Sequence, residues 1–353
     1  MSAATPAIVL GGTGYVAGEL LRLIAGHPLL DVAAVLSDSQ PGASIAGAFA
    51  HLQSAYPDMK FASLDEIETL IRRTPRSALF SAAPHGISAA LVDRLLTVAE
   101  AAGTQVHCVD ISADFRYSSA AAYEAVYKHP HGAPARIRQF TCAVPEHLQK
   151  SPTPHVAHPG CFATATLLAA VPLLALELTD PRLFVTGITG STGSGRKPIE
   201  GTHHPNRHGD FYSYGALSHR HVPEIIACAK LATGVETELN FVPHSGPFAR
   251  GIHVTVQATL RKSIDTARAL AALRSYYEKC PFVRVRGGAP RVKDVATSNY
   301  SNLGAVTNGN SIAVMSVVDN LNKGAAGGAI QWMNRLLGVA ETTGLTAPAP
   351  GWT

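Results

Sequence analysis

The sequence predicts an α/β protein of two domains: a Rossmann-type, doubly wound parallel sheet, then an α/β domain with a mixed or antiparallel sheet. Three observations predict this class. The chain has 353 residues, which is long for one hydrophobic core. Over about the first 150 residues, short apolar runs alternate with helical patterns, as in βαβ units. After residue 161, apolar residues alternate with polar ones, as in strands with one covered face.

The first half opens with an apolar run, the glycine-rich segment GGTGYVAGE and a helical pattern of leucines. A second apolar run follows, which completes the order strand, turn, helix and strand. The same alternation then continues along the chain. We therefore predict strands over 7–10, 32–36, 78–82 and 106–111, and a helix over 87–101.

The second half carries alternating segments at 183–190 and 252–260, with connectors rich in proline and glycine around them. These predict strands of an antiparallel sheet. A helix is predicted over 266–279 and a further strand over 311–318. The segment DNLNKGAAGGAIQWMNRLLG, which follows, predicts a closing helix whose small residues pack against another element.

Composition excludes several classes of protein. Hydrophobic residues make up 46% and charged residues 15%, as in globular proteins. The net charge is +4 and the basic residues are scattered, which argues against nucleic acid and is compatible with a small anionic substrate. Five cysteines without CxxC spacing predict a reducing compartment. The apolar stretch 163–178 is too short to span a membrane, and no signal peptide is recognisable, so we expect a soluble, cytoplasmic protein.

The glycine turn after the first strand predicts a phosphate site. Gly11, Gly14 and Gly18 stand between a strand and a helix, where small residues let backbone N–H groups approach a pyrophosphate. Taken alone, the spacing also fits a tight turn without a ligand. After the second strand, Asp38 favours NAD because a carboxylate accepts from a ribose 2′-OH, whereas the serines on either side could donate to a 2′-phosphate.

Cys161 is the strongest candidate nucleophile. It follows Pro159 and Gly160 and begins a long apolar helix, so its sulfur lies at a positive helix end that favours the thiolate. The other four cysteines stand in apolar or strand-like runs and are expected to pack as small hydrophobic residues. The alternative for Cys161 is a buried cysteine at a helix start with no chemistry.

Histidines cluster in two segments, THHPNRHGD and SHRHVPEI. A metal site is not favoured, because no third set of ligands has recognisable spacing and Arg220 adds a positive charge. If a helix begins near Pro223, His221 and Glu224 meet at i,i+3, and a carboxylate that orients an imidazole is typical of a general acid or base.

Together these segments resemble the N-acetyl-γ-glutamyl-phosphate reductase family, which is related to aspartate-semialdehyde dehydrogenase. The resemblance runs from the first turn almost to the end of the chain. The segments that carry it are GGTGYVAGELLRLIAGHP, AAPHG, VDISADFR, CAVPE, HPGCFATA, TGSTGSG, HRHVPEI, PHSGPFARGI, DNLNKGAAGGAIQ and ETTGL.

The resemblance implies an NADP-binding Rossmann domain over 1–160, completed by a C-terminal helix within 323–353. Residues 161–322 would form the catalytic and dimerisation domain, in a homodimer or homotetramer. Cys161 matches the family nucleophile. His219 and His221 match the histidines that supply the acid and base, and His221 is favoured because Glu224 could orient it.

Further positions match segments that contact ligands in the family. Those expected to bind the cofactor are Gly11, Thr13, Gly14, Tyr15, Val16, Ser37, Ser39, Pro84, His85, Gly86, Ser191, Gly193 and Asn320. Those expected to bind the substrate are Ser112, Arg116, His204 and Arg220. No metal is expected. Family members often carry T-S-R-S where this chain has L-S-D-S, so Asp38 leaves NAD open beside NADP.

The implied reaction is reduction of N-acetylglutamyl 5-phosphate to the 5-semialdehyde in arginine biosynthesis, by NADPH and through a thioester on Cys161. The loop SGRKPIEGTHHPNRHGD resembles instead a lysine-pathway relative, which reduces an aminoadipyl phosphate held on a small acidic carrier protein. In that alternative Lys197, Arg207 and Arg220 could dock the carrier. Two further hypotheses are a metal-dependent hydrolase and a non-catalytic nucleotide sensor.

Overall fold

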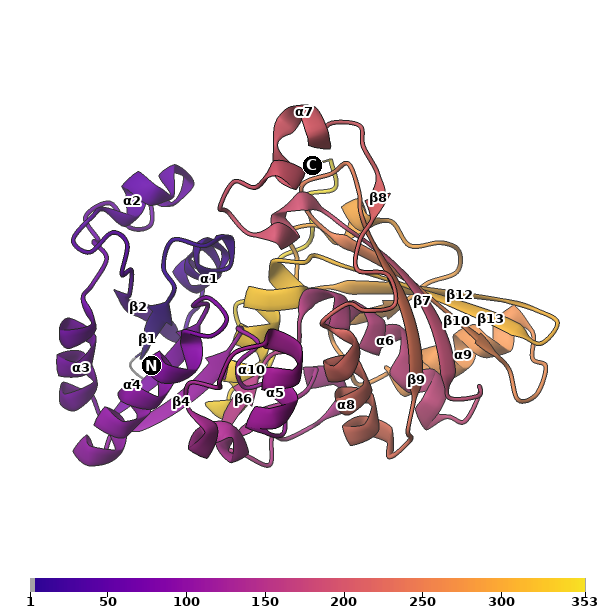
Figure 1. The fold of residues 1–353 in the computed structure, drawn as a ribbon, viewed down its shortest axis with the longest axis horizontal. Coiled ribbons are helices and arrows are strands. Elements are labelled where there is room, and N and C mark those ends of the chain that lie inside the picture. Colours follow the sequence, from indigo (N-terminus) through magenta and orange to yellow (C-terminus); the bar gives the residue numbers. More distant parts are fainter. Residues whose placement is uncertain (1–3, 353) are drawn as a thin grey trace. The chain divides into compact units, whose positions relative to one another are not determined.

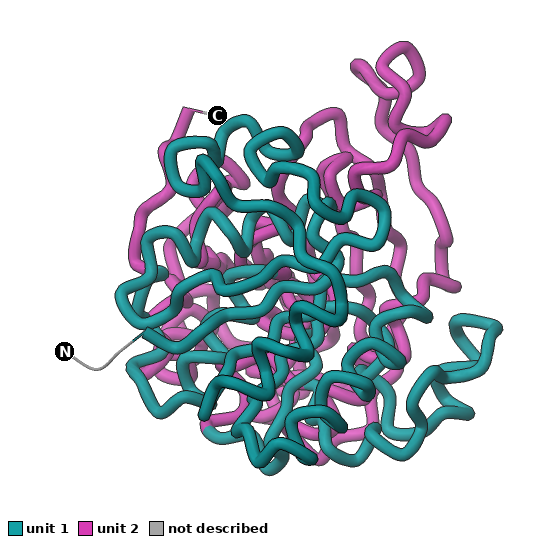
Figure 2. The backbone as a smooth tube through the Cα atoms, turned by 90° about the vertical axis from the view of Figure 1, so that its left-hand side faces the viewer, with its two compact units in different colours: residues 1–142, 150–158, 326–345 teal, residues 143–149, 159–325, 346–353 magenta. Residues whose placement is uncertain are grey.

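A computed structural model describes residues 4–352 (Figure 1). The chain forms two compact units (Figure 2). Unit 1 comprises the residues up to Cys142, Lys150–His158 and Ala326–Leu345. Unit 2 comprises Ala143–Gln149, Pro159–Ala325 and the residues from Thr346 onward. The chain therefore passes from one unit to the other several times.

Unit 1 is built on a six-stranded sheet in the order β2-β1-β3-β4-β6-β5, and every pair of neighbours is parallel. This confirms the predicted Rossmann-type sheet. Its strands are β1 (Thr5–Leu10), β2 (Leu30–Val35), β3 (Arg76–Ser81), β4 (Gln105–Asp110), β5 (Phe140–Cys142) and β6 (His155–Ala157). Its helices are α1 (Tyr15–Ala25), α2 (Ile45–Ala48), α3 (Leu64–Arg73), α4 (Ser88–Ala102), α5 (Ala120–Tyr127) and α10 (Gly327–Leu336).

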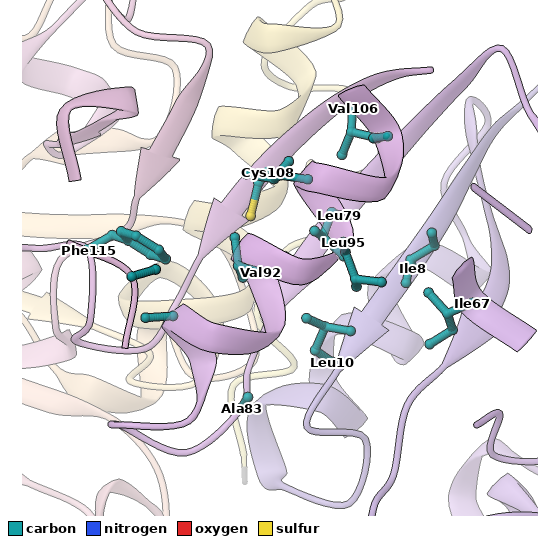
Figure 3. Close-up of a cluster of buried hydrophobic side chains, with 14 of the residues drawn as sticks. Ile8, Leu10, Ile67, Leu79, Ala83, Val92, Leu95, Val106, Cys108 and Phe115 are labelled. Carbon is teal, nitrogen blue, oxygen red and sulfur yellow. The ribbon is translucent and has the colours of Figure 1, made fainter. Parts of the chain in front are cut away.

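The hydrophobic core of unit 1 lies between the sheet and its helices. Ile8, Leu79 and Cys108 project from three successive strands of the sheet and are completely buried. Val92 and Leu95 of α4 pack against them (Figure 3). Such packing explains why these strands read as nearly continuous apolar runs, because a parallel sheet is covered on both faces.

Unit 2 is built on a mixed seven-stranded sheet in the order β11-β12-β13-β10-β7-β9-β8. The pairs β11–β12 and β7–β9 are parallel, and the others are antiparallel, which confirms the second predicted sheet. Its strands are β7 (Arg182–Thr189), β8 (Tyr212–Ser213), β9 (Glu238–Ser245), β10 (Ile252–Thr259), β11 (Val283–Val285), β12 (Ser301–Asn308) and β13 (Ser311–Val318). Its helices are α6 (Cys161–Ala175), α7 (His204–Arg207), α8 (Val222–Thr233) and α9 (Thr266–Tyr276).

Helix α6 is the centre of unit 2. Every residue from Phe162 to Leu174 is buried, so the helix is apolar on all sides, as a central core helix must be. It packs on β10, β13 and β7, while α8 contacts both α6 and β9 (Figure 1). Because α6 begins at Cys161, a helix buried in the core of the unit sets the position of that residue.

Two helix predictions need correction. The closing segment forms a π-helical turn over Asn322–Ala326, and its α-helix covers only Gly327–Leu336 of the predicted 323–353. Helix α9 ends at Tyr276, three residues before the predicted end, because the chain turns there toward Phe282. Within the described residues 4–352, no helix is long and apolar enough to cross a membrane.

Candidate active site

Cys161 is the first residue of α6 and is half-buried. Gly160 is the N-cap residue, with an extended backbone (φ −60°, ψ 158°), and it has no side chain that could cap the first turn. The N–H groups of a first helical turn point out of the helix start, where they attract negative charge. The positive end of the helix favours a thiolate at this place.

Gly160 brings two sequence motifs together. A Cβ atom on it would lie 2.5 Å from His221 Nε2 and 2.8 Å from Glu224 Oε1, so only glycine fits. The Gly160 N–H donates to Glu224 Oε1 over 2.8 Å, and the Glu224 side chain is 0% exposed. Because α8 begins at Val222, both residues reach Gly160 from the start of one helix. Glu224 thus holds the residue before Cys161, a contact that spacing alone did not predict.

His219 has a different place from His221. The His221 backbone N–H donates to His219 Nδ1 over 3.2 Å, and the two rings meet edge to face at 4.8 Å. Phe162 and Phe241 enclose the His219 ring. Burial, and then the charge of Arg220, lower the pKa of His219 to about 4. His219 is therefore neutral near pH 7 and acts as an acceptor within the turn, while the His221 ring stands against the residue before Cys161.

A pocket of about 360 Å³ opens beside Cys161. It combines a thiol, a guanidinium and several hydroxyl groups on a partly apolar wall. Burial, and then the Cys161 sulfur, raise the pKa of Tyr214, so its hydroxyl stays a hydrogen-bond donor. The lining residues are Cys161, Phe162, Thr189, Gly193, Ser194, Tyr214, Gly215, Ser218, His219, Arg220 and His221.

The sequence did not predict six of these residues: Phe162, Thr189, Ser194, Tyr214, Gly215 and Ser218. Each lies within a few positions of a motif that was singled out, and that proximity was the only available signal. Gly193 and Arg220, which were predicted for cofactor and substrate, do line the pocket. Lining a pocket does not test which molecule they bind.

Asn320 and Ser191 belong to the same unit. The Asn320 side chain donates to Thr192 Oγ1 over 3.0 Å and accepts from the Gly251 N–H over 2.6 Å. The Ser191 N–H donates to the Phe248 carbonyl over 2.9 Å. Asn320 thus fixes the loop that carries Gly193, and its predicted contact with the cofactor stays a prediction.

The glycine turn in unit 1 fits a pyrophosphate. Gly11 has φ +75°, and a Cβ on it would lie 2.4 Å from the Ala82 carbonyl oxygen, so the turn itself requires glycine. A Cβ on Gly14 would meet only Gly11, at 3.7 Å, which leaves the backbone open. Gly14 begins α1 without a side-chain cap or an acidic residue in the first turn. Thr13, Tyr15 and Val16 surround this open helix start.

Two serines follow β2, where the ribose was expected. Ser37 Oγ lies 3.3 Å from Ser39 Oγ and accepts from the Gln40 N–H. Asp38 between them is exposed. Both hydroxyl groups could donate to a phosphate, and the carboxylate of Asp38 could accept from a ribose hydroxyl.

The turn after β3 is held by a buried carboxylate. Asp114 accepts from the Gly86 N–H over 2.8 Å and from the Ala89 N–H over 2.9 Å. His85 Nδ1 accepts from the Ala113 N–H, next to Pro84. These hydrogen bonds fix the backbone of Pro84, His85 and Gly86, the segment that was predicted to contact the cofactor.

Ser112 and Arg116 are buried in unit 1. The Ser112 hydroxyl donates to Asp110 over 2.7 Å. Arg116 is 6% exposed and donates to the carbonyl oxygens of Ile111 and His158. Both side chains therefore have structural partners, and their predicted contacts with substrate stay predictions.

The loop around α7 separates the residues that were grouped there. His204 is exposed and its ring lies 5.1 Å from that of His208. Arg207 is buried and donates to the Asp210 carbonyl, so it cannot belong to a docking surface with exposed Lys197. Across residues 4–352, no three His, Cys, Asp or Glu side chains converge as metal ligands.

Comparison with known proteins places this geometry in a family. The semialdehyde dehydrogenase NAD binding domain matches residues 6–147, and the semialdehyde dehydrogenase dimerisation domain matches residues 161–320. N-acetyl-gamma-glutamyl-phosphate reductase of Pseudomonas entomophila (strain L48) is 38% identical over 96% of each chain. That of Nitrosococcus oceani is 37% identical over 96% of this chain and 97% of the relative.

The chain belongs to the N-acetyl-gamma-glutamyl-phosphate reductase family. The predicted resemblance is thus confirmed, and the chain is an oxidoreductase with a nicotinamide cofactor. Among solved structures, aspartate semialdehyde dehydrogenase II of Vibrio cholerae shares the fold, with a TM-score of 0.69 at 16% identity over 95% of this chain and 98% of that one. The Candida albicans enzyme with NADP gives 0.65 at 15% identity over 97% and 100%.

Proposed function

We propose that the protein reduces N-acetylglutamyl 5-phosphate to N-acetylglutamate 5-semialdehyde and phosphate, with NADPH, through a thioester on Cys161. One observation carries the proposal: Cys161 is the first residue of helix α6 and lines, with His221 and Arg220, one pocket. A nucleophile, a titratable imidazole and a cation for an anionic substrate thus converge. The names of relatives at 37–38% identity support the choice of substrate.

The first step is acyl transfer. The Cys161 thiolate attacks the carbonyl carbon of the acyl phosphate, a C–S bond forms, and the C–O bond to phosphate breaks with release of inorganic phosphate. The N–H groups in the first turn of α6 are placed to stabilise the oxyanion. Arg220, exposed at the pocket wall, attracts the anionic substrate.

The second step needs a proton at the oxygen of the same acyl group. A reduced nicotinamide, when bound, would supply hydride to the thioester carbon. His221, as an imidazolium, gives a proton to the oxyanion, and as a neutral imidazole it takes that proton back when aldehyde and thiolate separate. His219 is neutral at working pH and positions the His221 backbone.

The choice of NADP over NAD depends on the segment after β2. Ser37 and Ser39 present hydroxyl groups that suit a 2′-phosphate, and the structural neighbour with NADP supports this choice. Asp38 opposes it by charge. Initial rates with each cofactor test the point: a kcat/KM at least about tenfold higher for NADP⁺ supports NADP, and a preference for NAD⁺ contradicts it.

A homodimer or homotetramer is the proposed assembly. The side of the unit 2 sheet away from α6 exposes Phe184 (49%) and Val306 (48%), two large apolar side chains on strands β7 and β12. The description of the matching domain as a dimerisation domain supports this use. Sedimentation velocity tests it: wild type should sediment as a dimer or tetramer and Phe184→Asp as a smaller species. A wild-type monomer at micromolar concentration contradicts it.

The reverse reaction is the decisive assay. N-acetylglutamate 5-semialdehyde, phosphate and NADP⁺ are mixed with the protein, and the absorbance of the reduced cofactor is followed. Phosphate-dependent turnover supports reaction, substrate and cofactor together. Absence of turnover, from folded protein that binds NADP⁺, contradicts the proposed substrate and redirects the search to the longer, carrier-bound acyl phosphate.

A further inference from the structure

Three motifs meet behind the nucleophile, and two of them have no role in the reaction described above. The segment CAVPE contributes Glu146, and the segment DNLNKG contributes Lys323. Their side chains are 1% and 0% exposed and form an ion pair of 2.6 Å between Lys323 Nζ and Glu146 Oε1. Burial of two charges is expensive unless they pair well. Because an apolar pair could be as stable, the buried ion pair points to a role in positioning the segments that carry it.

The turn that carries Lys323 lies against Cys161. Lys323 belongs to the π-helical turn Asn322–Ala326, a form that is frequent at functional sites. A Cβ on the next residue, Gly324, would lie 2.8 Å from Cys161 Cβ. The glycine therefore allows the turn to support the nucleophile directly. If this turn shifted along its axis, the backbone at Gly324 that packs against Cys161 would shift with it.

The start of the same segment is fixed by Asp319, which is fully buried. Its carboxylate accepts from the N–H groups of Leu321 and Asn322 and pairs with Arg250 at 2.5 Å. The next residue, Asn320, holds the loop that carries Gly193 of the pocket. One rigid segment thus connects the pocket loop to the back of the nucleophile.

The segment that contains Glu146 is also linked to helix α6 by hydrogen bonds. Pro172 has no N–H, so the Leu168 carbonyl lacks the donor that a helix normally provides. The Tyr277 hydroxyl donates to that carbonyl over 2.7 Å and lies 2.8 Å from His147 Nε2. Residues 146 and 147 are therefore tied at once to the π-helical turn and to the helix that begins with Cys161.

We propose that Glu146 and Lys323 are positioning residues: their buried pair locks the π-helical turn, and through Gly324 the turn fixes the place of Cys161 at the helix start. The inference rests on the proposed function only for its kinetic readout. Neither side chain lines the pocket, so neither is expected to contact the substrate. Loosening the pair should misplace the sulfur and leave substrate affinity nearly unchanged.

Two pairs of variants test the proposal. The first compares Gly324→Ala with Gly287→Ala, since a Cβ on Gly287 meets nothing within 4 Å. The second compares the double variant Lys323→Met/Glu146→Gln with Lys230→Met/Glu236→Gln, an exposed pair of the same residue types in unit 2. The double replacement removes both charges, so no unpaired charge stays buried.

Two readouts are measured well below the melting temperature of each variant. Gly324→Ala and the buried double variant should each lower kcat of the reverse reaction by about tenfold or more, with KM within about threefold. Alkylation of Cys161 by iodoacetamide, followed on its peptide across pH, should slow by about fivefold or more. Both controls should match wild type in both readouts.

Folded variants with wild-type kcat and wild-type Cys161 alkylation would overturn the proposal. If the buried double variant does not fold, Gly324→Ala decides alone. The alkylation readout needs no substrate, so it tests positioning even if wild type fails to reduce the proposed acyl phosphate. A failure of the proposed function and a failure of this inference are therefore distinguishable.

Discussion

Two clusters of polar residues, one in each unit, differ in their surroundings. In unit 1, Asp110, Ser112 and Arg116 are buried: the Ser112 hydroxyl donates to Asp110, and Arg116 donates to two backbone carbonyls. In unit 2, Cys161 and Arg220 face a pocket. A buried, fully engaged polar group stabilises a shape, whereas one that faces a cavity is available for chemistry. The comparison favours a structural role for the first cluster and a role in the proposed reaction for the second.

The largest effect that sharpens this comparison is loss of the nucleophile. Cys161→Ser should lower kcat of the reverse reaction by at least about 10³-fold, because the hydroxyl is a much weaker nucleophile than the thiolate. The melting temperature should stay within a few degrees of wild type. Cys142→Ser, at a half-buried cysteine of unit 1, should retain most of the activity. Turnover by Cys161→Ser within tenfold of wild type would refute the thioester.

The next largest effect is a difference in kcat between variants of His221 and variants of His219. His221→Asn should lower kcat by about 10²-fold or more, because it removes the proton carrier. His219→Asn should cost less than about fivefold, because its side-chain oxygen can accept the His221 N–H as Nδ1 does. His219→Leu, which cannot accept, should cost about tenfold. Equal losses in His219→Asn and His221→Asn would show that His219 is the acid or base.

The two arginines test the comparison directly. Arg116→Met should lower the free energy of unfolding by about 2–3 kcal/mol, because buried carbonyl groups lose charged donors. Arg220→Met, at an exposed position, should leave stability unchanged and raise KM for phosphate or semialdehyde by about tenfold. Denaturant unfolding and initial rates measure the two effects. A large change in KM with unchanged stability in Arg116→Met would show that Arg116, in unit 1, contacts the substrate.

The smallest expected effect is on the free energy of unfolding at acidic pH. Burial lowers the pKa of His147 to about 4, so between pH 6.5 and 4 the unfolded chain binds a proton that the folded chain does not. The stabilising contribution is complete above pH 6.5 and is lost as the pH falls. His147→Gln should flatten the decline in unfolding free energy by at most about 1.4 kcal/mol per pH unit. Parallel declines in wild type and variant would exclude His147 as a cause.

Periodicity was sufficient to predict the fold class. Three long strands of unit 2 were predicted because eight residues can show their pattern clearly, as in the predicted 311–318 that matches β13. Strands β9 and β12 have the same length but were not predicted. Strands β5 and β6, of three residues each, lie below the length at which any period is visible. The π-helical turn was read as part of a helix because glycine and alanine in NKGAA do not distinguish the two forms.

The candidate site was predictable residue by residue only where chemistry marks a side chain. Cys161 and His221 have such marks, while the acceptor role of His219 required the turn geometry to be known. Glu224 was predicted for its spacing from His221, whereas its hydrogen bond from the Gly160 N–H could not be predicted from that spacing. Pairing between Glu146 and Lys323 joins residues 177 positions apart, which no local pattern can reveal.

The division of the chain between the units has a consequence for biosynthesis. Unit 1 starts at the first strand but includes Ala326–Leu345, where Trp332 and Met333 are completely buried. During translation, nearly half of the chain must be made after the last strand of this sheet before Ala326–Leu345 is available to cover it. A nascent chain that stops near residue 320 would leave apolar surface of unit 1 uncovered. Such truncated products should aggregate or be degraded even though the entire glycine turn and Cys161 have already been synthesised.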